Sequence, residues 1–319
     1  MTVLPRLSND RLESTVRTLH RALRAADQAL KAKDRPGYLR QQRTVGSVLE
    51  LLWDELAVPV WAVADSGPAP SEGRARRIWW VPSGLLWFLP LHAATSPGGA
   101  SLADLAVSSY APTVRMLQES RRRRPGPGGD PLVVTMPDTP GATPLPGAGE
   151  EAAVLRGLFP AARELRGPRA TRSAFESALP DHSWLHFAGH GVNAPEGTRL
   201  LLHDCEDDPL SAQDVLRMDL PRAELAYLSA CESAQTSVQL PDEATHFGAT
   251  LAVAGFRDVI GTLWRVTDPV AVRAARSFYG ALAAGDCDPA LALHRTVQEL
   301  RAAYPSMPGL WASHVHIGP

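Results

Sequence analysis

The sequence has little cysteine, with only three in 319 residues: Cys205, Cys231 and Cys287. Their spacings are unrelated, which is typical neither of a disulfide framework nor of a zinc ribbon. His186 and His190 lie in what reads as a strand, whereas a pair of metal ligands four residues apart requires a helix. We therefore expect no metal and no cofactor, and we expect each thiol to be free unless it has a function.

Long hydrophobic runs and a strong net charge are also missing. No window approaches ~18 uninterrupted apolar residues, and the N-terminus lacks the apolar core of a signal peptide. The formal net charge of −2 gives no electrostatic reason to expect nucleic acid or an acidic membrane as a partner. Hydrophobic residues make up 45% and charged residues 21%, as in ordinary globular proteins. We expect a cytoplasmic protein that binds neither nucleic acid directly nor a membrane.

The first part of the chain is expected to be helical. Five apolar residues recur roughly on one helical face: Leu12, Val16, Leu19, Leu23 and Leu30. A second helical pattern with a broad apolar face follows and ends near residue 64. Residues 65–77 have the composition of a linker. We therefore expect a helical region at 1–64, a linker at 65–77 and a second domain at 78–319.

Residues 78–319 alternate between short apolar runs and helical patterns. This alternation predicts an α/β fold with a mostly parallel sheet covered by helices on both faces. The break "PGPGGD" at 125–130 divides the domain into 78–130 and 131–319. The predicted strands include the runs at 77–82, 85–93, 131–136, 183–190, 224–231, 258–266 and 313–318.

Two of these strands deliver reactive side chains to one edge of the sheet. The run "SWLHFAGH" ends on His190, and the run "ELAYLSAC" ends on Cys231, 41 residues later. Catalytic groups gather at the carboxyl ends of parallel strands, so an imidazole and a thiol meet if the two strands are neighbours. The imidazole can take the thiol proton and later protonate a leaving amine, which is the chemistry of nucleophilic catalysis.

Gly189 and Gly191 enclose the histidine. Without a Cβ they let the backbone turn sharply and let a substrate approach closely. The N–H groups of Gly191 and Cys231 are candidates to hold the oxyanion of a tetrahedral intermediate. His190 precedes Cys231, an order opposite to that of papain-like enzymes and close to the ~50-residue spacing of caspases.

Several ordered motifs give the chain a family resemblance. "HFAGHG", "LSACESA", "DEATHFGATLAVAGFRDVIGTLWRVTDP" and "LWASHVHIG" follow one another, preceded by "WWVPSGLLWFLPLHA" and "PLPGAGEEAAVL". From about Arg77 to Gly318 the sequence resembles the CHAT family, which are caspase-like peptidases related to separase. The resemblance implies a caspase-type sheet whose first half, here 78–130, is a degenerate copy and whose second half, here 131–319, is catalytic.

By position, the resemblance makes His190 the catalytic histidine and Cys231 the nucleophile of a cysteine endopeptidase. It implies a protein substrate and activation by a protein partner or an appended region, often in bacterial immune or cell-death signalling. The chain departs from the family in having about 65 helical residues before the domain, without a 34-residue repeat, and it lacks the caspase motif "QACRG". The alternative is a non-catalytic scaffold with the caspase fold, against which the intact His–Cys pair counts.

Asp268 is the candidate for reading the residue before the scissile bond. It follows the strand at 258–266 in a stretch similar to the "LW-V-D" of separase, which prefers arginine, and a carboxylate there favours arginine or lysine. An N-cap role for Asp268, with Pro269 in the first helical turn, explains the spacing equally well. Further candidates for this pocket are Glu232, Asp242 and Glu243.

An arginine run, Arg121–Arg124, lies next to the break between the two halves. Its usual interpretation is a solvated charged surface. The alternative is self-cleavage by an arginine-preferring peptidase, at Arg122 or Arg123, because the ring of Pro125 hinders cleavage after Arg124.

Overall fold

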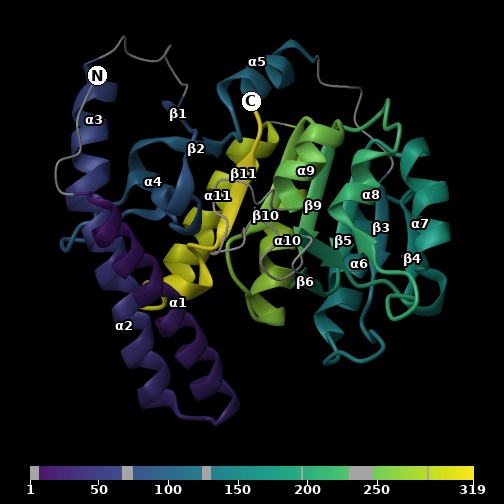
Figure 1. Ribbon diagram of the computed structural model, residues 1–319, viewed down its shortest axis with the longest axis horizontal. Coiled ribbons are helices and arrows are strands. Elements are labelled where there is room, and N and C mark those ends of the chain that lie inside the picture. Colours follow the sequence, from purple (N-terminus) through teal and green to yellow (C-terminus); the bar gives the residue numbers. More distant parts are fainter. Residues whose placement is uncertain (1–6, 67–74, 124–130, 195–196, 230–246, 286) are drawn as a thin grey trace.

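The computed structural model describes residues 7–66, 75–123, 131–194, 197–229, 247–285 and 287–319 (Figure 1). Its centre is an eight-stranded sheet with the strand order β1-β2-β11-β10-β9-β5-β3-β4. The bounds are β1 Arg77–Trp80, β2 Val107–Tyr110, β3 Pro131–Thr135, β4 Arg163–Arg166, β5 Trp184–Ala188, β9 Leu225–Ser229, β10 Asp258–Thr262 and β11 His314–Ile317.

The sheet consists of two blocks of parallel strands. One block holds β10, β9, β5, β3 and β4, and the other holds β1, β2 and β11. The blocks run in opposite directions and meet at the antiparallel pair β10–β11. Most strands are short apolar runs that are buried on both faces, which is typical of parallel sheets. The predicted α/β fold with a mostly parallel sheet is confirmed.

Helices cover both faces of the sheet. On one face, α6, α10 and α11 pack side by side. The opposite face carries α7, α8 and α9. The chain moves along the sheet in one direction from β3 to β4, and in the other direction from β4 to β5, β9 and β10. Because crossover connections between parallel strands are right-handed, the two directions place their helices on opposite faces. None of the helices in the described ranges is long and apolar enough to cross a bilayer. The bounds are α4 Leu102–Leu105, α5 Val114–Arg122, α6 Pro146–Leu158, α7 Arg172–Ala178, α8 Ala212–Leu216, α9 Phe247–Ala254, α10 Asp268–Ala283 and α11 Pro289–Ala303.

The N-terminal residues form a helical hairpin of α1 (Asn9–Lys31) and α2 (Arg35–Leu52). A π-helical segment, Trp53–Ala57, continues α2 into α3 (Val58–Asp65). Leu12, Val16 and Leu19 are buried in a core that the hairpin shares with the rest of the chain, as the helical pattern predicted. Leu30 is 47% exposed, because it lies in the last turn of α1, beyond this contact.

The apolar run at 85–93 is not a strand, contrary to the prediction. It forms two short 3₁₀ segments, Gly84–Phe88 and Leu91–Ala93, and the strand that pairs with β1 is β2. Apolar character shows that a segment is buried but cannot distinguish a strand from a buried turn of helix. Pro90 interrupts the run and lacks the N–H that a strand ladder needs.

A small antiparallel sheet begins at Gly191, directly after His190. It has the order β6-β7-β8, with β6 at Gly191–Ala194, β7 at Gly197–Leu200 and β8 at Leu210–Ser211. Because β6 starts at Gly191, His190 lies between the last residues of β5 and this second sheet.

Candidate active site

His190 lies just beyond the carboxyl end of β5, and the neighbouring strand is β9. Ala188, the last residue of β5, is directly opposite Ser229, the last residue of β9. The Gly189 N–H donates to the Ser229 carbonyl at 3.4 Å. The two strands are therefore adjacent, as the predicted meeting of imidazole and thiol requires. Cys231 follows Ser229 by two residues and lies outside the described residues, as do the pocket candidates Glu232, Asp242 and Glu243.

The His190 imidazole is held by a main-chain carbonyl. Its Nε2 lies 2.7 Å from the Thr143 carbonyl oxygen, and the ring is half-buried. The His190 backbone is fixed as well, because the Leu201 N–H donates to its carbonyl at 2.9 Å. Sequence reasoning did not identify Thr143. The available signal was topological, because the loop between β3 and α6 lies at the same edge of the sheet as His190.

Gly189 lies at a bend and is closely packed. A Cβ at this position would lie 3.0 Å from the Phe187 ring and 3.1 Å from the Met136 Cβ, and the residue has no positive φ. The backbone bends at Gly189, as expected, and close packing beneath the site is a further reason for a residue without a side chain. Gly191 is half-buried and pairs with Leu200 as the first residue of β6. Its contribution to an oxyanion hole stays a prediction.

Asp268 does not cap the helix that it begins. The N-cap of α10 is Thr267, and Asp268 is the first helical residue, followed by Pro269 in the first turn. The Asp268 carboxylate instead accepts, through Oδ2, a hydrogen bond from the Gly147 N–H at 3.0 Å, at the start of α6. The N-cap interpretation is thus wrong. The carboxylate stabilises the N-terminus of a different helix, where a negative charge is favourable.

A cavity of about 30 Å³ connects Asp268 with the ends of the two central strands. Gly189 and Ser229 line it, together with Glu151 from α6 and Arg265 from the segment before α10. The Glu151 side chain is only 3% exposed, and its Oε1 accepts a hydrogen bond from the Ser229 hydroxyl at 2.9 Å. The sequence pattern identified Glu151 only as part of a helix, because nothing local shows that its side chain points into the protein.

A buried histidine lies behind this cavity. His186, in β5, is fully buried; its Nδ1 is 3.2 Å from the Tyr279 hydroxyl and its ring stacks on Tyr227. Burial, and then the nearby Glu151 carboxylate, raise the pKa of Tyr227 well above its ordinary value. Burial likewise raises the pKa of Tyr279, so both phenols stay neutral. Among the described residues, no group of three or more His, Cys, Asp or Glu side chains could hold a metal ion.

A serine, a histidine and an aspartate also meet in the middle of the sheet. Ser109 Oγ is 2.8 Å from His316 Nδ1, and His316 Nε2 is 2.8 Å from Asp258 Oδ1. These are the residue types of a serine-hydrolase triad, with the two ring nitrogens exchanged. The three residues are 1%, 0% and 4% exposed, so no substrate can reach the hydroxyl. They join β2, β11 and β10, and their role is structural.

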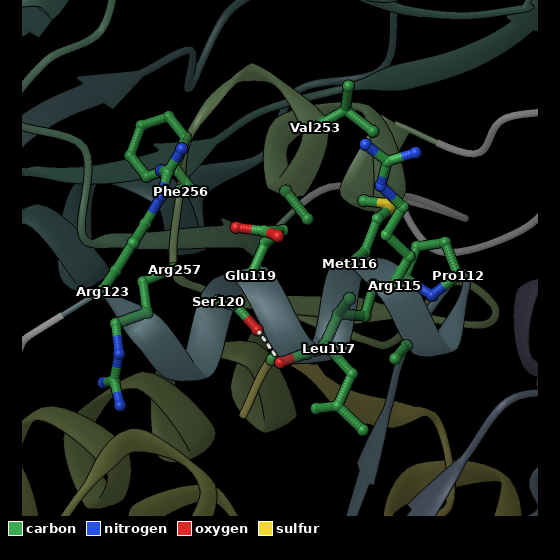
Figure 2. Close-up of a pocket in the computed structure, with 14 residues that line it drawn as sticks. Pro112, Arg115, Met116, Leu117, Glu119, Ser120, Arg123, Val253, Phe256 and Arg257 are labelled. Carbon is green, nitrogen blue, oxygen red and sulfur yellow. Dashed lines mark hydrogen bonds between the residues drawn. The ribbon is translucent and has the colours of Figure 1, made fainter.

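A groove of about 280 Å³ lies at the opposite edge of the sheet (Figure 2). α5 forms one wall with Arg115, Met116 and Glu119, and Val253 of α9 faces them. Phe256 also lines the groove and lies two residues before β10 begins, whereas His190 lies at the edge where the parallel strands end. The length of the strands therefore separates the groove from the candidate site, and none of the predicted site residues in the described part of the chain lines it.

The chain matches known proteins by family and by fold. A family model of the CHAT domain matches residues 46–319. The Saccharomyces cerevisiae separase–securin complex at 2.6 Å superposes with a TM-score of 0.55 and 14% identity, over 89% of this chain and 19% of that chain. The same complex at 3.0 Å gives a TM-score of 0.54 and 15% identity, over 75% of this chain and 15% of that chain.

A complex of the pro- and mature domains of Porphyromonas gingivalis RgpB is also similar. It superposes with a TM-score of 0.50 and 10% identity, over 86% of this chain and 68% of that chain. A comparison with curated protein sequences found no significant match. At these identities the solved structures show the fold, and the chain spans less than a fifth of the separase chains. The fold is that of caspase-like cysteine peptidases, and with the family model covering residues 46–319, the chain belongs to the CHAT-domain family.

Proposed function

We propose that the chain is a cysteine endopeptidase in which Cys231 is the nucleophile and His190 the general acid–base. The observation that carries the proposal is the position of His190 at the end of β5, beside β9, whose last residue Ser229 precedes Cys231 by two residues. Membership of the CHAT family and the caspase-like fold support the same chemistry. The substrate is a protein, cleaved without a metal or a cofactor.

The hydrogen bond to Thr143 assigns a role to each nitrogen of His190. A carbonyl oxygen only accepts hydrogen bonds, so Nε2 carries the hydrogen and donates it. In a neutral imidazole the lone pair then lies on Nδ1. Nδ1 is therefore the atom that takes the Cys231 proton, and the Thr143 carbonyl stabilises the imidazolium that forms.

The reaction has two stages. The thiol proton passes to His190 Nδ1, and the sulfur forms a bond to the carbonyl carbon of the scissile peptide. The N–H groups of Gly191 and Cys231 stabilise the oxyanion. The C–N bond breaks as Nδ1 gives its proton to the leaving amine, which leaves a thioester. Water then adds to the thioester carbon and gives a proton to His190; the C–S bond breaks, the carboxylic acid leaves, and the proton returns to sulfur.

Asp268 is our candidate for recognising a basic residue before the scissile bond. Its carboxylate lines the cavity that reaches Ser229 and Gly189, next to the end of β9. One of its oxygens accepts from Gly147, and a carboxylate has enough lone pairs to accept further hydrogen bonds from a guanidinium or an ammonium. Glu232, Asp242 and Glu243 remain further candidates.

Regulation by a protein partner or by the N-terminal helices is proposed from a chain of hydrogen bonds that reaches the segment before Asp268. Gln42 of α2, 2% exposed, accepts through Oε1 from the Gly309 N–H at 2.8 Å. Trp264 Nε1 donates to the Gly309 carbonyl at 2.8 Å, and Trp264 lies four residues before Asp268. A movement of the α1–α2 hairpin would thus be transmitted to the segment that holds Asp268.

This proposal fits the division of the chain into a helical region at 1–64, a linker at 65–77 and a peptidase domain at 78–319. By extension from the family, we propose that the protein acts in the cytoplasm in bacterial defence or cell-death signalling. Self-cleavage near Arg122 is part of the same proposal.

Replacing Gln42 by alanine is expected to lower kcat/KM for peptide cleavage by about 3- to 10-fold, because the Trp264 segment loses one of its supports. The matched control is Gln41→Ala, a half-buried neighbour whose change should leave turnover within about twofold. Steady-state kinetics with an arginine-containing peptide measures both. Equal turnover of the two variants, with unchanged thermal unfolding, would show that the hairpin does not regulate cleavage.

Labelling with iodoacetamide tests the proposed nucleophile, with two cysteines of the same chain as controls. Burial, with the Glu206 and Asp204 carboxylates, raises the pKa of the Cys205 thiol, and the half-buried Cys287 Sγ contacts the Ala281 carbonyl at 3.6 Å. Both are therefore poor nucleophiles. We expect Cys231 to react at least about tenfold faster, followed by mass spectrometry. A Cys231 that reacts no faster, in a chain that cleaves no peptide, would favour the non-catalytic scaffold.

A further inference from the structure

Glu151 is a buried carboxylate with one oxygen that has no hydrogen-bond partner among the described residues. It lies in the second turn of α6 with 3% of its side chain exposed. Its Oε1 accepts from the Ser229 hydroxyl at 2.9 Å. Its Oε2 is 3.4 Å from His186 Nε2 and makes no hydrogen bond with any residue in the described part of the chain. A buried carboxylate is costly unless its lone pairs are satisfied, so this oxygen has capacity for a further donor.

The Glu151 carboxylate lines the cavity at the end of β9, whose last residue precedes the proposed nucleophile by two positions in the sequence. Glu151 and Asp268 both line this cavity, together with Ser229 and Gly189. α6 sets the arrangement, because Gly147 donates to Asp268 and Glu151 lies four residues further along the same helix face. The cavity therefore has a carboxylate from α10 and a second carboxylate from α6.

The cavity suits the flat end of a basic side chain. Its volume of about 30 Å³ has room for about two water molecules, close to the tip of a guanidinium and too small for an aromatic ring. Arg265 also lines the cavity, but it is exposed and forms no ion pair with either carboxylate among the described residues. The potential cation beside Glu151 is His186, whose Nε2 lies 3.4 Å from Oε2. Asp268 forms no ion pair among the described residues, so a ligand that brings several donors at once is favoured where both carboxylates line the cavity.

We propose that Glu151 is a second specificity-determining residue, which together with Asp268 binds the guanidinium of an arginine before the scissile bond. A guanidinium presents five N–H donors in a rigid fork and can reach two carboxylates, whereas the lysine ammonium is a compact point charge. The pocket then selects arginine over lysine, and both over the neutral isostere citrulline. This inference rests on the proposed peptidase function and specifies its substrate class.

Four peptide amides that differ only before the scissile bond test the inference, with arginine, lysine, citrulline or leucine at that position. The full 319-residue chain is compared with Glu151→Gln, which keeps the side-chain shape and an acceptor for Ser229. We expect kcat/KM for the arginine peptide to fall about 10- to 100-fold, mostly through KM, while the citrulline and leucine peptides change less than about threefold. Glu150→Gln, at the exposed neighbouring carboxylate, should leave all four peptides unaffected.

A purely structural role for Glu151 gives a different pattern. Loss of kcat for every peptide alike, with slower iodoacetamide labelling of Cys231, would mean that Glu151 only positions Ser229 and would overturn the inference. Glu151→Asp provides a second measurement if the glutamine variant unfolds, because it keeps the charge and should keep the preference for arginine over citrulline. Equal cleavage of arginine and citrulline peptides by the unaltered chain would remove the inference and leave the peptidase. Absence of any cleavage and of Cys231 labelling would remove both.

Discussion

Replacing Cys231 by alanine is expected to lower kcat/KM for peptide cleavage by about 10⁴- to 10⁶-fold, close to the uncatalysed rate. The proposed reaction proceeds through a bond between the Cys231 sulfur and the scissile carbonyl carbon, and alanine has no nucleophilic atom that could replace the sulfur. Cleavage of an arginine-containing peptide, followed by mass spectrometry of both products, measures the loss. Cys205→Ala and Cys287→Ala are the matched controls and should retain full activity.

The His190→Ala variant shows whether the two residues act as one unit. Members of a catalytic unit are strongly non-additive, so the double variant should be no slower than the slower single variant. Residual turnover in Cys231→Ala above about 1% of the original rate would contradict a thiol nucleophile. Multiplicative effects of the two changes would instead mean that His190 contributes by a route that does not involve Cys231.

Replacing Asp268 by asparagine should lower kcat/KM for arginine peptides by about 10²- to 10³-fold, with little change for leucine peptides. Asparagine keeps the oxygen that accepts from the Gly147 N–H, so the start of α6 stays supported and only the negative charge is lost. The measurement is kcat/KM for arginine and leucine peptides in parallel. Glu299→Gln is a suitable control, because Glu299 lines the same surface cavity as Asp268 but not the cavity that reaches Ser229.

An equal loss for arginine and leucine peptides would assign Asp268 a structural role at the junction of α10 and α6. Unchanged cleavage after arginine would exclude it as the recognition residue and return the choice to Glu232, Asp242 and Glu243. A preference for a non-basic residue in the unaltered chain would keep the peptidase and remove Asp268 from its specificity.

Much of the fold could be predicted from the sequence because the central strands are continuous apolar runs. "PLVVT", "WLHFA" and "LAYLS" form β3, β5 and β9, which lie side by side and are nearly all buried. Local helix signals are equally informative: Thr171 is the N-cap of α7 and its hydroxyl accepts from the Ala174 N–H at 3.2 Å. These features depend on the residues within one segment, so they can be read without knowledge of the fold.

Features that depend on contacts between distant segments could not be predicted in this way. The Thr143 carbonyl contacts His190, which lies 47 residues further along the sequence, and any residue type can supply a main-chain carbonyl. Glu151 and Ser229 are 78 residues apart, and only the packing of α6 against the sheet shows that they meet. β2 was missed because "VSSY" is short and partly polar, while its burial comes from the neighbouring strand β11.

The position of β11 has a consequence for how the chain folds. β11 is the last strand in the chain but lies inside the sheet, between β2 and β10, and it joins the two blocks of opposite direction. Ser109 and His316, which meet there, are 207 residues apart in the sequence. Closing so long a loop is entropically costly and slow. The pair β1–β2 can therefore join the rest of the sheet only after β11 has paired with β10. Without residues 314–317, β2 and β10 would each become an unpaired edge that is prone to aggregation.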